Sequence, residues 1–246
     1  MRRKNFTLVA IVIIAVCMFG LSQTSTAFAT QAITTDVTYH GIHDKKGGCI
    51  YTISAPANTH GKSIHSDLAS CTMVMERKPG PAPDAPKGGV AGPKKAFNTA
   101  AGGTDPTSQG HVQVWTWDVD GQADDSVFAY LTWSWNGWSV TGPYAWYWGK
   151  WWANNDGSGV SWDNNWYNDY FNSYFYQWNS NEVMSYSTAR FYTDFITWNG
   201  DYNIYDTYNY VAFHGYGNGD FYCNWSVDQN AFGNGIGYIC TLDWVN

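Results

Sequence analysis

The sequence has very few basic residues beyond position 95. From residue 96 to the end, Lys150 and Arg190 are the only lysine and arginine, while the same stretch contains fifteen aspartates and glutamates. Nucleic-acid binding depends largely on the neutralisation of phosphates by lysine and arginine. Two cations in an acidic region cannot supply that neutralisation, so nucleic acid is excluded as a partner.

Catalytic signatures are absent as well. The sequence contains no Gly-x-Ser-x-Gly and no His-Glu-x-x-His motif. A glycosidase needs two carboxylates placed across a cleft. After residue 110 there is a single glutamate, Glu182, and nothing in the spacing of the aspartates selects a partner for it. The sequence therefore favours a non-catalytic protein, and a secreted hydrolase acting on polysaccharide stays as an alternative.

Long apolar runs are missing except for one near the N-terminus. The run Leu8–Leu21 follows basic residues at positions 2–4 and precedes a small-x-small site at 27–29. It is shorter than the roughly 20 residues that a membrane-spanning helix needs. This order of segments is typical of a secretory signal peptide. We expect residues 1–29 to be such a peptide, and the mature chain to be secreted, extracellular or held at the cell surface, with no transmembrane segment.

Four cysteines remain once the one inside the apolar run is set aside, namely Cys49, Cys71, Cys223 and Cys240. An even number of cysteines in an exported chain indicates disulfides rather than free thiols. Three pairings are possible. The pairing Cys49–Cys71 with Cys223–Cys240 is favoured because each pair lies within one segment of the chain.

Composition divides the predicted mature chain into three parts. Residues 30–76 form a small unit that contains cysteine and histidine, residues 77–110 are rich in Pro, Gly and Lys as linkers are, and residues 111–246 hold all fifteen tryptophans. In the last part, strong helix formers are scarce and aromatic and β-branched residues alternate with polar ones. We predict an all-β fold, in which an aromatic-rich antiparallel sandwich, jelly roll or barrel follows the small β unit and the linker.

Two of the Asn-Gly pairs in this last part follow strand-like runs. Asn136-Gly137 and Asn199-Gly200 each follow a run of alternating aromatic and β-branched residues. Asn-Gly favours a two-residue type I′ hairpin, in which both central residues have positive φ. Residues 154–165, by contrast, are expected to form a loop.

The small unit contains an imperfect duplication of histidines and cysteines. His40 and His43 precede Cys49, and the pattern recurs with a second pair of histidines, His60 and His65, before Cys71. These residue types can hold zinc or copper. The competing interpretation is that the cysteines form a disulfide, which removes the thiolates and leaves solvated imidazoles.

A second candidate for an ion site is an acidic run that contains a glycine. Closely spaced carboxylates on such a turn offer the oxygen ligands that calcium prefers. The predicted ligands are Asp118, Asp120, Asp124 and Asp125. The alternative is a solvated acidic turn between two strands. Of the two candidate ion sites, the calcium site is the better supported by the sequence.

Aromatic residues are so dense from position 133 to 152 that one core cannot bury all of them. Exposed tryptophan beside asparagine and aspartate suits carbohydrate, because flat rings stack on sugars and polar groups reach the hydroxyls. The predicted ligand-binding residues are Trp133, Trp135, Trp138, Trp146, Trp148, Trp151 and Trp152. We therefore expect a secreted protein that binds a carbohydrate or cell-surface polymer. A self-associating structural protein of the extracellular matrix or cell surface is the alternative, and the oligomeric state is left open.

Overall fold

The computed structural model describes residues 34–45, 47–82, 90–91, 95–98, 105–117, 123–151, 167–177, 179–196, 202–229 and 235–245. The predicted signal peptide, most of the linker, the loop at 154–165, the Asn199-Gly200 turn, Asp118, Asp120 and Trp152 lie outside these residues. Within the described part of the chain, no helix is long and apolar enough to cross a membrane.

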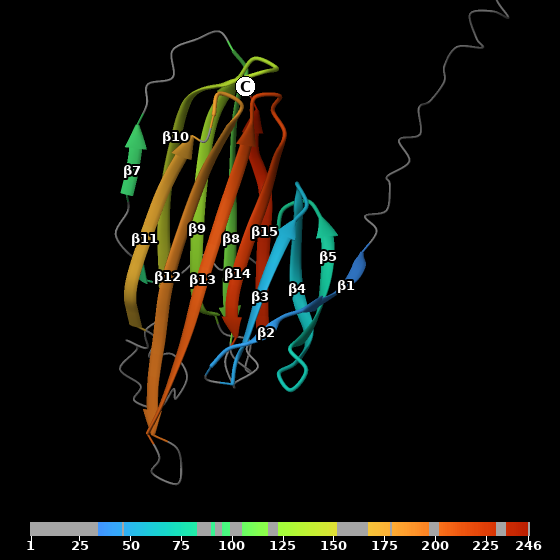
Figure 1. Ribbon diagram of the computed structural model, residues 1–246, viewed down its shortest axis with the longest axis vertical. Helices are drawn as coiled ribbons and strands as arrows, with labels where there is room; N and C mark the ends of the chain where they lie inside the picture. Colours follow the sequence, from blue (N-terminus) through green and yellow to red (C-terminus); the bar gives the residue numbers. More distant parts are fainter. Residues whose placement is uncertain are drawn as a thin grey trace, which may run out of the picture. The chain divides into compact units, whose positions relative to one another are not determined.

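The described strands pair antiparallel and form two sheets (Figure 1). Sheet A contains, in spatial order, β1 (Thr35–His40), β5 (Thr72–Pro79), β4 (Thr59–Asp67), β15 (Gly235–Val245), β8 (Thr107–Trp117), β9 (Ala123–Trp135), β10 (Val140–Trp151) and β6 (Val90–Ala91), and β7 (Lys95–Asn98) also pairs with β10. Sheet B contains β11 (Tyr167–Gln177), β12 (Glu182–Ile196), β13 (Tyr202–Tyr216), β14 (Phe221–Gln229), β3 (Cys49–Ala55) and β2 (Ile42–His43). Both sheets are open, so the predicted all-β class is confirmed as two antiparallel sheets and not as a closed barrel.

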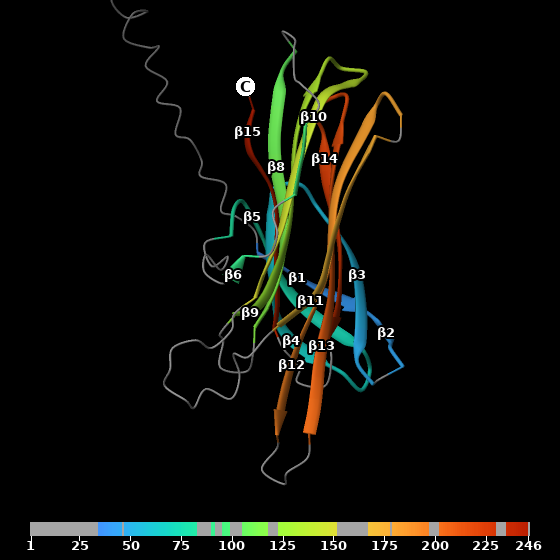
Figure 2. The ribbon, with the colours of Figure 1, turned by 90° about the vertical axis from the view of Figure 1, so that its left-hand side faces the viewer.

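The two sheets face each other, as the edge-on view in Figure 2 shows. A core rich in aromatic side chains lies between them. Successive residues of a strand point to opposite faces of a sheet. In β9, the fully buried Leu131 and Trp133 belong to the core, whereas Tyr130, the residue before Leu131, is only half-buried on the outer face. Trp225 of sheet B lies 5.6 Å from Tyr238 of sheet A between ring centroids, and Trp133 lies 5.8 Å from Phe213. Aromatic rings therefore fill the space between the sheets.

Both predicted disulfides are confirmed. Cys49 of β3 pairs with Cys71, the residue before β5, and Cys223 of β14 pairs with Cys240 of β15. Each bond therefore ties sheet B to sheet A. Loops of this length stabilise a fold by about 3 kcal/mol each if the bond acts by restricting the unfolded chain.

Strands from the predicted small unit take part in both sheets. β4 pairs with β15 in sheet A, and β3 pairs with β14 in sheet B. The side chains of Tyr51 and Met75 are fully buried in the same core cluster as Trp133 and Trp225. The described residues before the linker and those after it thus share one pair of sheets and one core.

Candidate functional site

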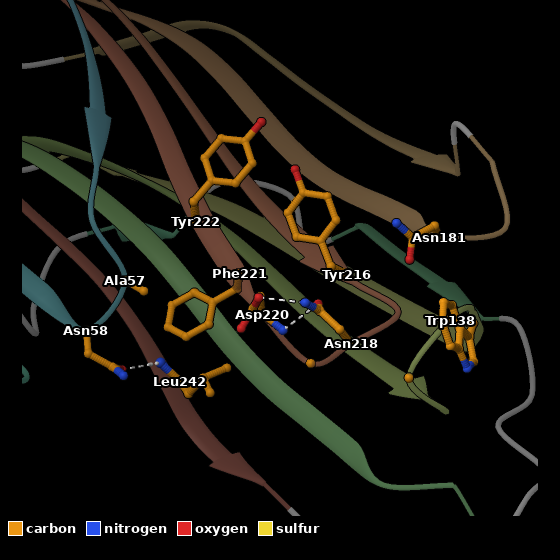
Figure 3. A pocket seen from close by; sticks show the side chains of 12 residues that line it. Ala57, Asn58, Trp138, Asn181, Tyr216, Asn218, Asp220, Phe221, Tyr222 and Leu242 are labelled. Atoms are coloured by element: carbon orange, nitrogen blue, oxygen red, sulfur yellow. Dashed lines mark hydrogen bonds between the residues drawn. The ribbon is translucent and has the colours of Figure 1, made fainter.

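Three turns meet at one end of the two sheets, the upper end in Figure 1. They join β9 to β10, β11 to β12, and β13 to β14. A pocket of about 950 Å³ opens beside them. It is lined by Ala57, Asn58, Gly137, Trp138, Asn181, Tyr216, Asn218, Gly219, Asp220, Phe221, Tyr222 and Leu242 (Figure 3). This pocket is the candidate functional site.

Backbone hydrogen bonds tie the three turns together. The amide of Gly137 donates to the carbonyl of Gly217 at 2.7 Å, and the amide of Gly217 donates to the carbonyl of Asn181 at 2.8 Å. A third bond runs from the amide of Val140 to the carbonyl of Ser180 at 2.7 Å. The three turns therefore form one connected unit and not three independent loops.

Trp138 lies in the turn between β9 and β10, and its conformation is set by Asn136. The side-chain oxygen of Asn136 accepts hydrogen bonds from the backbone amides of Trp138, at 3.1 Å, and Ser139, at 3.0 Å. Such local bonds are a common role of asparagine in turns. The indole of Trp138 is 85% exposed. A large apolar side chain is thus held in solvent on a well-braced turn.

This turn corrects one prediction from the sequence. β9 ends at Trp135 and β10 begins at Val140, so the connection has four residues instead of two. Gly137 has a φ of +95°, but Asn136 does not have a positive φ, which a type I′ turn would require. Asn136 contributes through its side chain, and this is why the following tryptophan is in a loop and not in a strand.

Glycines allow the turn between β13 and β14 to approach its neighbours closely. A Cβ at Gly217 would lie 2.5 Å from the amide nitrogen of Ser139. Gly219 has a φ of +87°, and a Cβ there would lie 2.8 Å from the ring of Trp135. Any larger residue at these positions would separate the turn from the Trp138 turn.

Polar groups line the pocket beside the exposed indole. Figure 3 shows Trp138 at one end of the pocket and Asn58 with Leu242 at the other. Between them, the side-chain amide of Asn218 donates to Asp220 at 2.6 Å, and the backbone amide of Asp220 donates back to Asn218 at 3.1 Å. The pocket thus combines an apolar ring with amide and carboxylate groups fixed in place.

A hydrogen-bonded cluster supports the wall of the pocket. Nδ1 of His214 lies 2.9 Å from Glu182, and the hydroxyl of Tyr216 donates to the same carboxylate oxygen at 3.3 Å. The ring of His214 also stacks on Tyr222, with centroids 4.2 Å apart. Because the carboxylate is an acceptor, Nδ1 carries the proton, and Nε2 faces the side-chain amide of Asn224 at 3.5 Å.

Burial decides the protonation state of this cluster. Desolvation lowers the pKa of His214 in spite of the opposing effect of Glu182. Desolvation likewise raises the pKa of Tyr216, with Tyr222 and Glu182 adding to the shift. At neutral pH the imidazole and the phenol are therefore both uncharged.

The seven tryptophans predicted to bind ligand fall into different environments. Trp133 is fully buried and donates from Nε1 to the carbonyl of Tyr216 at 3.0 Å. Trp135 is half-buried and donates to Ser108 at 2.9 Å. Trp138 alone of these three lines the pocket. Trp133 and Trp135 thus do not line the pocket and instead form hydrogen bonds within the fold.

Trp146 and Trp148 lie together on the outer face of sheet A, away from the pocket. Trp146 stacks on Tyr130 with centroids 4.1 Å apart, and Trp148 stacks on Phe128 at 4.3 Å. At these separations one face of each indole is covered by its neighbour. Trp151 belongs to β10, but its side chain, like the whole of Trp152, lies outside the described residues.

Of the four predicted calcium ligands, only Asp124 and Asp125 are described. Both are fully buried, and as neighbours in β9 they point to opposite faces. Asp125 lies between the sheets, where it accepts hydrogen bonds from Thr116 and Thr207, both at 2.8 Å, and from Asn209. Burial raises the pKa of Asp125 to about 6. These two carboxylates therefore do not share a site with each other.

The histidine and cysteine duplication brings only one histidine to the sulfur atoms. Nδ1 of His43 lies 3.2 Å from the sulfur of Cys71, which is bonded to Cys49. His60 is elsewhere and makes a 2.8 Å contact with the carbonyl of Gly80. Because the sulfurs are joined in a disulfide, they are not available as thiolate ligands.

Several residues of the site were not predicted from the sequence. Tyr216, Asp220 and Tyr222 reach the pocket from the β13–β14 hairpin, and Asn181 reaches it from the turn before β12. The closest available signal was the alternation of glycine in the stretch His214–Asp220, which marks a turn with close neighbours. No family model, no curated protein and no solved structure matches this chain.

Proposed function

We propose that the protein is an extracellular, non-catalytic binding protein that recognises carbohydrate at the pocket beside Trp138. The observation that carries the proposal is the 85% exposure of Trp138 on a turn that is held in place by the side chain of Asn136 and by hydrogen bonds to the two neighbouring turns. Exposing a large apolar ring forgoes roughly 1.5–3 kcal/mol of burial. A ligand that covers the ring would recover part of that energy.

The chemistry around Trp138 suits a sugar. Sugar rings offer apolar C–H faces for stacking on an aromatic ring, together with hydroxyls that need hydrogen-bond partners. Asn181 and Asn218 supply amides, and Tyr216 and Tyr222 supply hydroxyls, within the same pocket. Asp220 in the pocket and Glu182 behind it make the site acidic, which disfavours polyanionic ligands.

The proposal concerns binding because the carboxylates near the pocket are already engaged. Asp220 is hydrogen-bonded to Asn218, and Glu182 is hydrogen-bonded to His214 and Tyr216. Both groups are thus held as parts of the scaffold. Their bonds explain how the turns and the pocket wall keep their shape without a ligand.

The test is to titrate the protein with neutral and anionic polysaccharides and follow binding by calorimetry. The wild type should bind at least one neutral polysaccharide, and Trp138→Ala should weaken that binding by about tenfold or more through loss of the stacking surface. Ile64→Ala is the matched control, because Ile64 is also an exposed apolar side chain, at 55%, and does not line the pocket. Binding that is equally strong in Trp138→Ala, or absent throughout a broad panel, would contradict the proposal.

A further inference from the structure

The outer face of sheet B carries a group of mostly aromatic side chains that begins at the pocket. Tyr222 lines the pocket and stacks on His214, and by strand register the next two positions across the sheet are Met184 and Tyr176. Tyr186 and Tyr174 are paired in the adjacent row. We call these six residues on β14, β13, β12 and β11 the tyrosine lane.

Resting on the function proposed above, we propose that the tyrosine lane is an extended subsite, so that the ligand is a linear, neutral polysaccharide chain and not a single sugar. The lane begins at Tyr222, a residue of the pocket, so a chain bound in the pocket would extend toward the lane. It crosses three strand spacings, which is about 14 Å. That span exceeds the width of one sugar ring.

The rings of the lane are accessible at its far end. Tyr174 and Tyr176 are 45% and 43% exposed, respectively. Their centroids lie 5.0 Å and 5.9 Å from that of Tyr186, which is a wider separation than in the face-to-face stacks of sheet A. Ring surface and hydroxyl groups are therefore both presented to solvent along β11.

The middle of the lane is closely packed. His214 and Met184 are each 6% exposed, and Ala212, opposite Tyr186, is fully buried. The rings of Tyr222, Tyr186 and Tyr176 therefore form the accessible surface that a bound chain would contact. They belong to β14, β12 and β11 of sheet B (Figure 1).

Charge also favours a neutral chain. The lane contains no Lys, Arg, Asp or Glu, and Glu182, the acid beside it, is paired with His214. The nearest cation on this face, Arg190, is bound by Asp169 at 2.7 Å and Asp206 at 2.6 Å. Burial raises the pKa of Tyr186 to about 12, so its phenol stays protonated and can both donate and accept.

The lane predicts that affinity increases with chain length. Cellohexaose, chitohexaose, xylohexaose and mannohexaose should each be compared with the corresponding disaccharide by calorimetry, using the intact mature protein. For the series that binds, the wild type should bind the hexasaccharide at least about tenfold more tightly than the disaccharide, because additional rings are contacted.

Substitutions at the far end of the lane separate it from the pocket. The double variant Tyr174→Ala/Tyr176→Ala should weaken hexasaccharide binding about tenfold and leave disaccharide binding unchanged, whereas Trp138→Ala should weaken both. Thr188→Ala is the matched control, because Thr188 is on the same face of β12 but outside the lane. Thermal unfolding verifies that the variants are folded.

The outcomes distinguish this inference from the proposed function. If Trp138→Ala weakens binding but the double variant binds the hexasaccharide as the wild type does, the lane is overturned and the pocket stands. If the double variant instead converts a dimer to a monomer by light scattering with unchanged affinity, the face is an interface between copies, and the lane is likewise overturned. If none of the oligosaccharides binds, both proposals fail.

Discussion

Aromatic side chains cover the outer faces of both sheets, but they are packed in two different ways. On sheet A, Trp146 and Trp148 stack face to face on Tyr130 and Phe128 at 4.1–4.3 Å. Sheet B instead has tyrosines whose rings are spaced more widely and whose edge members are nearly half exposed. The number of aromatic residues on a face therefore does not reveal the role of that face. What distinguishes the two faces is whether each ring is covered by a stacked neighbour or exposed to solvent.

The largest expected effect on stability comes from Asp125, which lies between the two sheets. The pKa of Asp125 is about 6 in the folded protein, above its ordinary value of 3.8, so the folded state holds the proton more tightly than the unfolded state. Stability should therefore fall as pH rises from about 4 to about 6, by up to about 3 kcal/mol, and then stay level. Asp125→Asn should abolish this fall, as measured by urea unfolding across that pH range.

The replacement amide can be accommodated by one rotation. The side-chain oxygen of Asn209 has no hydrogen-bond partner among the described residues, so flipping its amide would let it accept from the new group. Asp36→Asn is the control, because Asp36 is exposed and outside the core. A variant whose stability still falls between pH 4 and 6 like that of the wild type would show that Asp125 isn't the responsible group.

The next effect compares the two outer faces directly. Trp148→Ala removes a ring that stacks on Phe128 and lies 3.7 Å below the ammonium group of Lys150, so it should lower the free energy of unfolding by about 2 kcal/mol. Tyr174→Ala on sheet B removes an exposed ring and should change that free energy by less than about 0.5 kcal/mol. Equal losses in chemical denaturation would remove the distinction between the faces.

The smallest expected change in stability tests whether the close packing of the β13–β14 turn against its neighbours stabilises the fold. Gly219→Ala combines a φ of +87° with a Cβ only 2.8 Å from the Trp135 ring, while Gly47→Ala has nearly the same φ with nothing within 4 Å. Gly219→Ala should therefore destabilise the protein by about 1 kcal/mol more than Gly47→Ala does, measured by thermal or urea unfolding. It should also weaken oligosaccharide binding, because the displaced turn carries the Trp138 turn with it. Matching losses in the two variants would argue against the close packing at Trp135.

The class of fold could be predicted from the sequence because it depends on local patterns. Alternation of aromatic and β-branched residues indicated strands, and the spacing of Cys223 and Cys240 indicated the correct disulfide. The pairing of β3 with β14 had no such signal, since it joins segments about 170 residues apart in the chain. The composition of the sequence suggested separate parts before and after the linker. The pairing of β3 with β14 instead joins these two parts in one sheet.

The site could be predicted only in part, because burial depends on which strands become neighbours. Trp133, Trp135 and Trp138 look equivalent in the sequence, yet they are fully buried, half-buried and exposed. The difference at Trp138 comes from the side-chain hydrogen bonds of Asn136, which change the length of the turn. Tyr222 joins the site because β13 and β14 form a hairpin that packs on the β9–β10 turn, and no local pattern specifies that contact.

The position of the two disulfides gives the sandwich a resistant half and a weaker half. All four cysteines are on or beside β3, β5, β14 and β15, whereas β10 and β11, at the other side of the two sheets, are held to the opposite sheet by noncovalent contacts in the described structure. Partial opening of the sandwich therefore begins most easily along β10 and β11. Protease resistance and slow amide exchange should be concentrated around the cysteines, and the exposed end of the tyrosine lane is on the half that is held by noncovalent contacts.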